Sequence, residues 1–434
     1  MYIRQVTQLT RVVSAIRANR RLAGDSLWGI TAQLVGVGSG LTSFFCLGRR
    51  LGPAGYGLFI GLYSCVGLLT AFAYSGSFLT MIQRGKTSDG FDQEILGSCL
   101  AQVFCFDVVL SFVGVGVTHL IVRSISLEVV FVVFLCELTL SSVTEYSASC
   151  LQMLGHYATA TRLRMMQNLT KIILLLVLYS HHLLSIRSLV FGYLITYPFV
   201  AMVAVTVVRR RAGVRFRIGR LRADLVRQGL AYSGGMAAFG AQNDADKVVL
   251  SASHLPVDTG LYSAAYKIVQ MGLLPIGAIV DASHMRFVRT GPTGRNYFLR
   301  KSASHTLVTF SFGSVVAILI YFLSYLPQSF LGEQFKASSS ILRWLAPLVP
   351  LRGLSAFPIN GLMGLEKIAF RTWLIALSAA VSIGLYVALI PRHGWKGAAI
   401  GTLLSESFLV VAMWTGLIYQ QRVANRSVQQ SLAV

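Results

Sequence analysis

The sequence predicts an all-helical protein that crosses a membrane many times. Only 12% of its 434 residues are charged, 54% are hydrophobic, and the mean hydropathy is +0.65. Soluble domains carry about 25% charged residues, so this chain has too few charges to cover a water-facing surface. The apolar residues form long runs, without the short alternating segments that are typical of a membrane β-barrel.

Twelve stretches are apolar over the roughly 20 residues that a helix needs to cross a bilayer. They lie at about 27–48, 57–80, 95–121, 127–150, 166–183, 187–208, 229–251, 261–283, 304–325, 338–362, 371–391 and 397–419. We therefore expect an all-α polytopic membrane protein with about 12 transmembrane helices, in two six-helix halves around a central cavity.

The longest polar connection, 209–228, contains eight arginines and follows the sixth predicted span. Six spans return the chain to its starting side, so the two halves would be parallel repeats, as in several transporters. The predicted order is a basic amphipathic cytoplasmic segment 1–26, an N-terminal half 27–208, a basic cytoplasmic linker 209–228, a C-terminal half 229–420 and a cytoplasmic tail 421–434. A disordered basic tail is the alternative for 1–26.

The strongly basic charge, +22, follows from the orientation of the spans. With a cytoplasmic N-terminus, 26 of the 38 Lys and Arg residues lie in cytoplasmic segments and seven lie in external loops. This asymmetry obeys the positive-inside rule and predicts that both termini are cytoplasmic. It explains the charge without nucleic acid, whose binding would require an exposed basic face.

The seventh and eighth spans carry polar residues that are expensive to place in a bilayer. A central charge costs about 2.5–3.5 kcal/mol on insertion scales, so these residues are candidates for a binding cavity. The candidates are Asn243, Asp244, Asp246, Lys247, Tyr262, Tyr266, Lys267 and Gln270. The alternative is local: Asp244 pairs with Lys247 at i,i+3, and both lysines extend toward the membrane surface.

The tenth span combines Arg343 and Arg352 with Pro347, Pro350 and Pro358. Prolines interrupt the helical hydrogen bonds, and interrupted helices often form the binding site of a transporter. Asn360 lies two turns beyond Arg352 on a similar face. In the alternative interpretation, the prolines make a structural kink and Arg352 binds the freed backbone carbonyls.

Carboxylates in the first half are candidates for ion coupling, because intramembrane acids can carry protons or bind Na⁺. These are Asp107, Glu137 and Glu145. Two plainer expectations compete: Asp107 neutralises Lys171, and Glu145 is solvated near the inner end of its helix. Asp281 and Glu406 are interpreted as packing residues. No metal site, cofactor site or catalytic set is predicted, so we expect a protein that is not an enzyme.

Several segments give the chain a family resemblance. They are RLGPAGYGLF at 50–59, NDADKVVL at 243–250, TGLYSAAYK at 259–267, and GWKGAAIGT at 394–402 followed by Glu406. The chain resembles the polysaccharide-biosynthesis flippases, the O-antigen and exopolysaccharide transporters of the multidrug/oligosaccharidyl-lipid/polysaccharide (MOP) superfamily. The resemblance covers about 24–420, although the family has one Asp in the seventh span where this chain has Asp244 and Asp246.

The resemblance implies a flippase of the bacterial inner membrane that moves an undecaprenyl-pyrophosphate-linked oligosaccharide by alternating access. Lys247, Lys267 and Arg352 would then hold the pyrophosphate, while tyrosines and amides would contact sugar. Membrane lipids, a polysaccharide polymerase and glycosyltransferases are the implied partners. A cation-coupled multidrug exporter, a peptidoglycan-precursor flippase and a non-transporting scaffold for glycan assembly remain alternatives.

Overall fold

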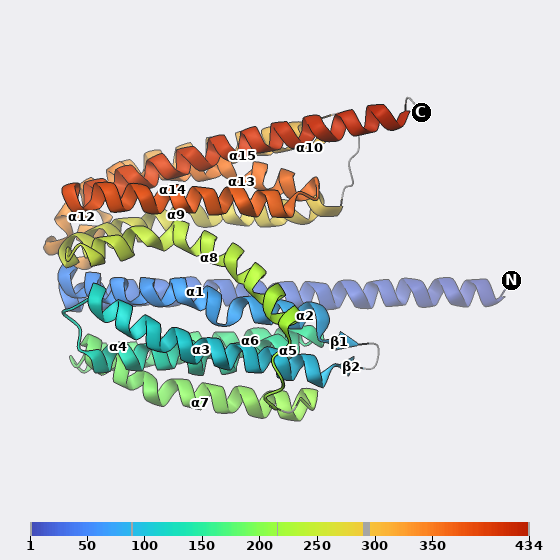
Figure 1. Cartoon of the computed structure of the whole chain (residues 1–434), viewed down its shortest axis with the longest axis horizontal. Helices are drawn as coiled ribbons and strands as arrows, with labels where there is room; N and C mark the ends of the chain where they lie inside the picture. The colour runs from blue at the N-terminus through green and yellow to red at the C-terminus, as the bar shows by residue number, and fades with distance from the viewer. Residues whose placement is uncertain (1, 88–89, 215, 290–295, 433–434) are drawn as a thin grey trace. The chain divides into compact units, whose positions relative to one another are not determined.

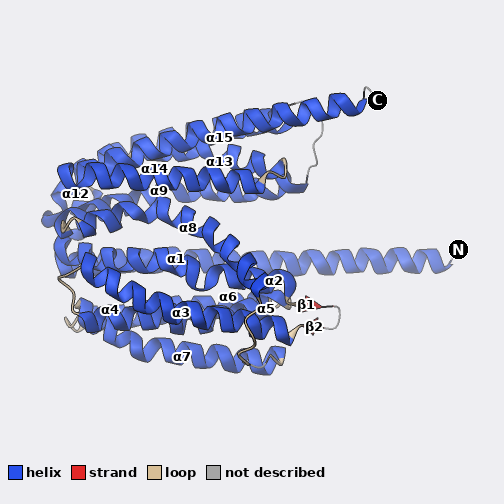
Figure 2. Cartoon of the chain, in the orientation of Figure 1, coloured by secondary structure: helices blue, strands red, loops and turns tan. Residues whose placement is uncertain are grey.

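The computed structural model describes residues 2–87, 90–214, 216–289 and 296–432. Side chains are described within 28–74, 76–87, 90–214, 216–283, 287 and 296–425. The side chains of the predicted amphipathic segment 1–26 and of most of the tail 421–434 lie outside this part. Within it, the regular secondary structure is helical apart from one short strand pair, β1 (Lys86–Thr87) with β2 (Gly90–Phe91), and loops join the elements (Figure 2).

Nine helical segments in the described residues are long and apolar enough to cross a membrane. The first of them, Trp28–Arg84, has two helical legs that meet at a kink, because Gly52 has non-helical backbone angles (φ 67°, ψ −179°) and Pro53 begins the second leg. This segment comprises most of α1 (Tyr2–Thr70), a π-helical turn (Ala71–Ser75) and α2 (Gly76–Arg84). Its two legs are the first two predicted spans.

Two further predicted spans are helical but fall outside those nine. Polar residues interrupt the apolar sequence of α8 (Ala223–Ala252), and the tenth span is divided into α12 (Lys336–Leu345) and α13 (Leu348–Gly364). The division lies at Ala346 and Pro347, so the predicted interruption is confirmed. With these two and the second leg of Trp28–Arg84, each of the twelve predicted spans corresponds to helix.

Two compact units are formed by the chain. Unit 1 comprises Met1–Cys46, Phe72–Val115 and Glu128–Ser233, and unit 2 comprises Leu47–Ala71, Gly116–Leu127 and Gly234–Val434. Because unit 2 includes two segments that precede the basic linker, the units differ in membership from the predicted halves 27–208 and 229–420. That division into halves stays a prediction.

Unit 1 is built around α5 (Ser141–Met153), which packs against α2, α6 and α7. Its core contains the buried residues Phe78, Met81, Tyr146 and Leu151. Unit 1 also contains α3 (Gln93–Ile121) up to Val115, α4 (Leu127–Phe134) from Glu128, a π-helical turn (Leu135–Leu140), α6 (Tyr157–Ser180) and α7 (Ile186–Ala212), together with the first parts of α1 and α8.

The basic linker is attached to unit 1. The Gly219 amide donates to the Gly97 carbonyl at 2.9 Å, and the Arg222 amide donates to the Ser98 hydroxyl at 3.2 Å. Asp224 accepts hydrogen bonds from Arg84 and Arg222, both at 3.1 Å. The bond from Arg222 holds the pKa of Asp224 below its usual value. These contacts join the described residues 219–224 of the linker to the rest of unit 1.

Unit 2 has α13 at its centre, in contact with α9 (Pro256–Arg289), α10 (Tyr297–Phe322) and α15 (Trp395–Leu432) (Figure 1). α14 (Ile368–His393) packs along α15. The short elements α11 (Leu326–Leu331) and a 3₁₀ turn (Glu333–Phe335) precede α12. The segment Leu47–Ala71 meets α9 closely: a Cβ on Gly57 would lie 1.9 Å from the Pro256 carbonyl oxygen. This close approach gives Gly57, the last glycine of the RLGPAGYG segment, a packing role.

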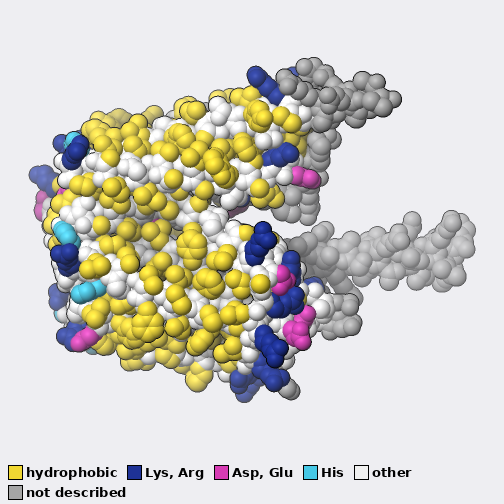
Figure 3. Space-filling model, viewed as in Figure 1, with side chains coloured by type: hydrophobic (Ala, Val, Ile, Leu, Met, Phe, Trp, Pro, Cys, Tyr) yellow, Lys and Arg dark blue, Asp and Glu magenta, His cyan; other side chains and the backbone are white. Residues whose placement is uncertain are grey.

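The surface of each unit is that of a membrane protein. On the face drawn in Figure 3, hydrophobic side chains cover the middle of the helices and charged side chains gather at their ends. Exposed fractions reach 71% for Phe112 and 76% for Ile195 in unit 1, and 72% for Phe322 in unit 2. Such extended apolar surfaces are typical of contact with lipid. The chain is a multi-pass membrane protein.

Candidate functional site

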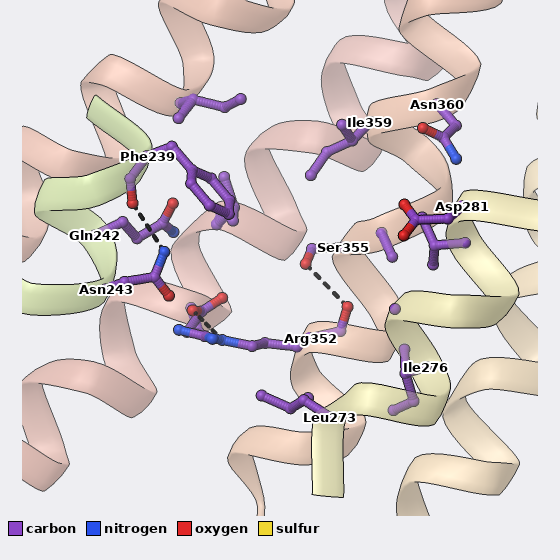
Figure 4. A pocket seen from close by; sticks show the side chains of 16 residues that line it. Phe239, Gln242, Asn243, Leu273, Ile276, Asp281, Arg352, Ser355, Ile359 and Asn360 are labelled. Atoms are coloured by element: carbon purple, nitrogen blue, oxygen red, sulfur yellow. Dashed lines mark hydrogen bonds and ion pairs between the residues drawn. The ribbon is translucent and has the colours of Figure 1, made fainter. Parts of the chain in front are cut away.

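A cavity of about 300 Å³ lies within unit 2, among α8, α9, α13, α14 and α15 (Figure 4). Its walls are largely apolar, with Phe239, Leu273 and Ile276 among them. The polar residues that line it are Gln242, Asn243, Asp281, Arg352, Ser355, Asn360 and Glu406. An apolar pocket with a few convergent polar groups is the usual form of a small-molecule site.

Arg352 is the basic residue of this cavity. It lies in α13, shortly after the break at Pro347, and 20% of its side chain is exposed. Its Nε donates to Oε1 of Glu406 at 2.8 Å, and one terminal nitrogen donates to the Tyr266 hydroxyl at 2.8 Å. The alternative in which Arg352 binds carbonyls freed by the prolines is wrong, because these partners are side chains.

Lys247 lies beside the cavity in a cluster of carboxylates and tyrosines. Its ammonium group is 2.9 Å from Asp244 and 3.3 Å from Asp246, and 4.2 Å from the centre of the Tyr266 ring. The local pairing of Lys247 with Asp244 is confirmed. The tyrosine ring connects this cluster to Arg352, because its hydroxyl accepts from the guanidinium group.

Asp246 belongs to a second set of hydrogen bonds. Tyr262 donates to it at 2.7 Å and lies 2.9 Å from the Thr402 hydroxyl, which in turn is 3.1 Å from Tyr386. Asp246 is the more buried of the two aspartates, with 1% of its side chain exposed against 37% for Asp244. Neither Thr402 nor Tyr386 was predicted as a site residue from sequence, although Thr402 ends the GWKGAAIGT segment.

The predicted substrate-binding residues therefore separate into groups. Arg352, Asn243 and Asn360 line the cavity, whereas Lys247, Asp244, Tyr262 and Tyr266 form the adjacent cluster. Lys267 and Gln270 are half-buried on α9 and line neither. In the described part of the chain, Lys267 makes no hydrogen bond or ion pair. Glu406, interpreted from sequence as a packing residue, is the residue that binds Arg352.

The predicted ion-coupling carboxylates of unit 1 have different surroundings. Glu137 pairs with Lys171 at 3.0 Å and accepts from the Tyr197 hydroxyl, and Glu145 pairs with Arg164 at 3.0 Å. The expectation that Asp107 neutralises Lys171 is wrong, because Glu137 occupies that role. Asp107 is 1% exposed, and its Oδ1 has no hydrogen-bond partner among the described residues.

The sequence matches a known protein family. Residues 22–284 match the model of the polysaccharide biosynthesis protein family. The chain belongs to this family. No curated protein matches the sequence.

Solved structures share the fold across most of the chain. A multidrug resistance MATE family transporter of the MOP superfamily, in an inward-facing conformation, has a TM-score of 0.70 at 13% identity, covering 90% of this chain and 95% of its own. The lipid II flippase MurJ, inward closed, has a TM-score of 0.68 at 14% identity, with 90% and 86% covered. A MOP superfamily transporter from Pyrococcus furiosus Vc1 has a TM-score of 0.61 at 12% identity, with 93% and 94% covered.

The chain is therefore a member of the polysaccharide biosynthesis family with the fold of MOP-superfamily transporters. At these low identities the structural likeness concerns the fold alone. Neither comparison identifies a substrate.

Proposed function

We propose that this member of the polysaccharide biosynthesis family flips a polyprenyl-diphosphate-linked oligosaccharide repeat unit across the bacterial inner membrane. The translocated unit would supply assembly of a surface polysaccharide, an O-antigen or an exopolysaccharide. Both termini would lie in the cytoplasm, in agreement with the distribution of basic residues. Family membership supports the process, and the cavity of unit 2 supports the chemical class of the substrate.

The observation that carries the proposal is the guanidinium group of Arg352 on an apolar cavity. A guanidinium group has five N–H donors in a planar fork that matches phosphoryl oxygens. Glu406 and Tyr266 take one donor each. The remaining donors would bind a diphosphate, and charge-assisted bonds of this kind are strong where water is scarce. The amides of Asn243, Gln242 and Asn360 would contact sugar or phosphate oxygens.

Lys247 would act mainly through its neighbours. Because Asp244 and Asp246 already neutralise its ammonium group, we assign it the task of holding Tyr266, whose hydroxyl orients Arg352. Among the described residues Lys267 has no such partners, and from outside the cavity wall it would add positive charge when the substrate is bound. Movement of the substrate would follow alternating access, as in other transporters built from two repeats.

A cation-coupled multidrug exporter is the second candidate. The carboxylates Asp281 and Glu406 on the cavity and the buried Asp107 are the features that favour it. A peptidoglycan-precursor flippase would use the same diphosphate chemistry as the first proposal and differ in the sugar and peptide that it accepts.

Transport by purified protein in proteoliposomes separates these functions. The substrates would be fluorescent polyprenyl-diphosphate glycans, a fluorescent peptidoglycan precursor and a cationic dye. We expect movement of the first, with a loss of at least tenfold in Arg352→Ala. Arg343→Ala is the matched control, because Arg343 lies in α12, donates to Ser324 at 2.8 Å and does not line the cavity. Movement of the dye alone, or of the precursor alone, would contradict the proposal.

A further inference from the structure

Glu406 presents a carboxylate whose two oxygens have different surroundings. Oε1 accepts from Nε of Arg352 at 2.8 Å, whereas Oε2 is buried and has no hydrogen-bond partner in the described part of the chain. Only 3% of the side chain is exposed, and the residue lines the cavity. A buried carboxylate in this position depends on its one cation, because an unpaired buried charge is strongly unfavourable.

No other described cation around the cavity can take the place of Arg352. The charged and titratable groups near Glu406 are Arg352 from α13, Tyr266 and Asp281 from α9 and, behind Tyr266, Lys247 and Asp246 from α8. Lys247 is already held by two carboxylates. From α8, the nearer residues Gln242 and Asn243 are neutral. α14 contributes Ile375 and the hydroxyl of Tyr386, which lies 3.1 Å from Thr402 one turn before Glu406 in α15.

We propose that Glu406 binds a proton when the anionic ligand displaces it from Arg352. This inference rests on the proposed function, because it takes a diphosphate as the ligand. When phosphoryl oxygens accept the N–H groups of Arg352, the Arg352–Glu406 ion pair opens. The carboxylate, then buried beside a second anion, takes one proton from water on its free oxygen and becomes a neutral acid. Release of the ligand restores the ion pair and returns that proton.

The exchange makes ligand binding depend on pH in a defined direction. Binding leaves two anions side by side in a largely apolar cavity, and proton uptake removes one of these charges. Binding therefore takes up a proton, and affinity rises as the pH falls. By linkage the slope is at most about tenfold in Kd per pH unit.

Calorimetry on the wild-type protein in nanodiscs tests the proton uptake directly. The probe is a short-chain polyprenyl diphosphate esterified to N-acetylglucosamine, a diester whose phosphoryl groups do not titrate near neutral pH. Titrations near pH 7 in two buffers of different ionisation enthalpy give the number of protons bound per ligand. We expect a value close to one. A value of zero with measurable binding would overturn the inference and leave the proposed function standing.

Variants identify the residue that takes the proton. Glu406→Gln is permanently neutral, so it should bind the probe at about pH 8 at least tenfold more tightly than the wild type and take up no proton. Asp281→Asn, which removes the other carboxylate of the cavity, should keep the wild-type proton uptake. Equal pH dependence in wild type and Glu406→Gln would overturn the inference. Failure of the wild type to bind the probe at any pH would instead overturn the proposed function.

Discussion

The side chains of Lys247 and Asp246, which are neighbours in the chain, form an ion pair of 3.3 Å in the interior of unit 2. Both are almost fully buried, with side-chain exposures of 7% and 1%. Lys247→Ala would leave the carboxylate of Asp246 uncompensated, and breaking a buried pair in this way costs about 3–5 kcal/mol. We expect a large fall in the Tm of the purified protein.

The double variant Lys247→Ala/Asp246→Asn should recover most of that loss, because it removes the stranded charge as well. Asp244→Asn alone should cost less, since Asp244 is 37% exposed and Asp246 would still neutralise the lysine. A wild-type Tm for Lys247→Ala would contradict the structural role assigned to the pair.

The substitution Gly57→Ala tests the close contact between the segment Leu47–Ala71 and α9. An added Cβ would lie 1.9 Å from the Pro256 carbonyl oxygen, so Gly57→Ala must push the two helices apart. Overpacking of this kind costs about 1–3 kcal/mol or more. Gly67→Ala is the control in the same helix, because no atom lies within 4 Å of its added Cβ. Fluorescence-detected chromatography and Tm measurement should show loss only for Gly57→Ala, and equal stability of the two variants would refute the contact.

Asp107 is the predicted coupling residue that has no ion pair in the described structure. Asp107→Asn should therefore fold with an unchanged or higher Tm, whereas Glu137→Gln should lower the Tm because it leaves Lys171 without its carboxylate. If Asp107 carries the coupling ion, its Asn variant should lose the response of transport to an imposed proton or Na⁺ gradient. Transport by this variant that still follows the gradient would exclude Asp107 from coupling.

Helix α8 passes from unit 1 to unit 2 between Ser233 and Gly234. Glycines at this boundary leave the helix less rigid, since Gly is about 0.5–1 kcal/mol less favourable than Ala within a helix. The variant Gly234→Ala/Gly235→Ala should therefore be as stable as the wild type or more so, yet transport several-fold more slowly.

Gly240→Ala is the matched control for this pair, because Gly240 lies in the same helix with no atom within 4 Å of an added Cβ. It should gain about half as much stability as the double variant and keep its transport rate. Equal rates in both alanine variants would show that the boundary glycines are not a hinge.

Features that depend on the local order of residues along the chain were predictable from the sequence. Apolar runs predicted the spans, and the i,i+3 spacing predicted the pairing of Asp244 with Lys247. Pairs between helices were not predictable, because they depend on how each helix is rotated against its neighbours. Arg352 and Glu406 are 54 residues apart in sequence, and Lys171 pairs with Glu137 rather than Asp107 for the same reason. Asn243, Arg352 and Asn360 were predicted to bind substrate and line the cavity. Asp281 and Glu406, which were interpreted as packing residues, line it as well, and Gln242 and Ser355 were not predicted.

The central claim is that the guanidinium group of Arg352 recognises a diphosphate, and the direct test compares two lipids that differ only in that group. Binding to protein in nanodiscs would be measured for a polyprenyl-diphosphate glycan and for the same glycan joined to the lipid without phosphate. We predict that the wild type prefers the diphosphate by at least tenfold, and that Arg352→Gln loses this preference through weaker binding of the diphosphate lipid alone. A preference that survives in Arg352→Gln, or is absent from the wild type, would contradict the claim.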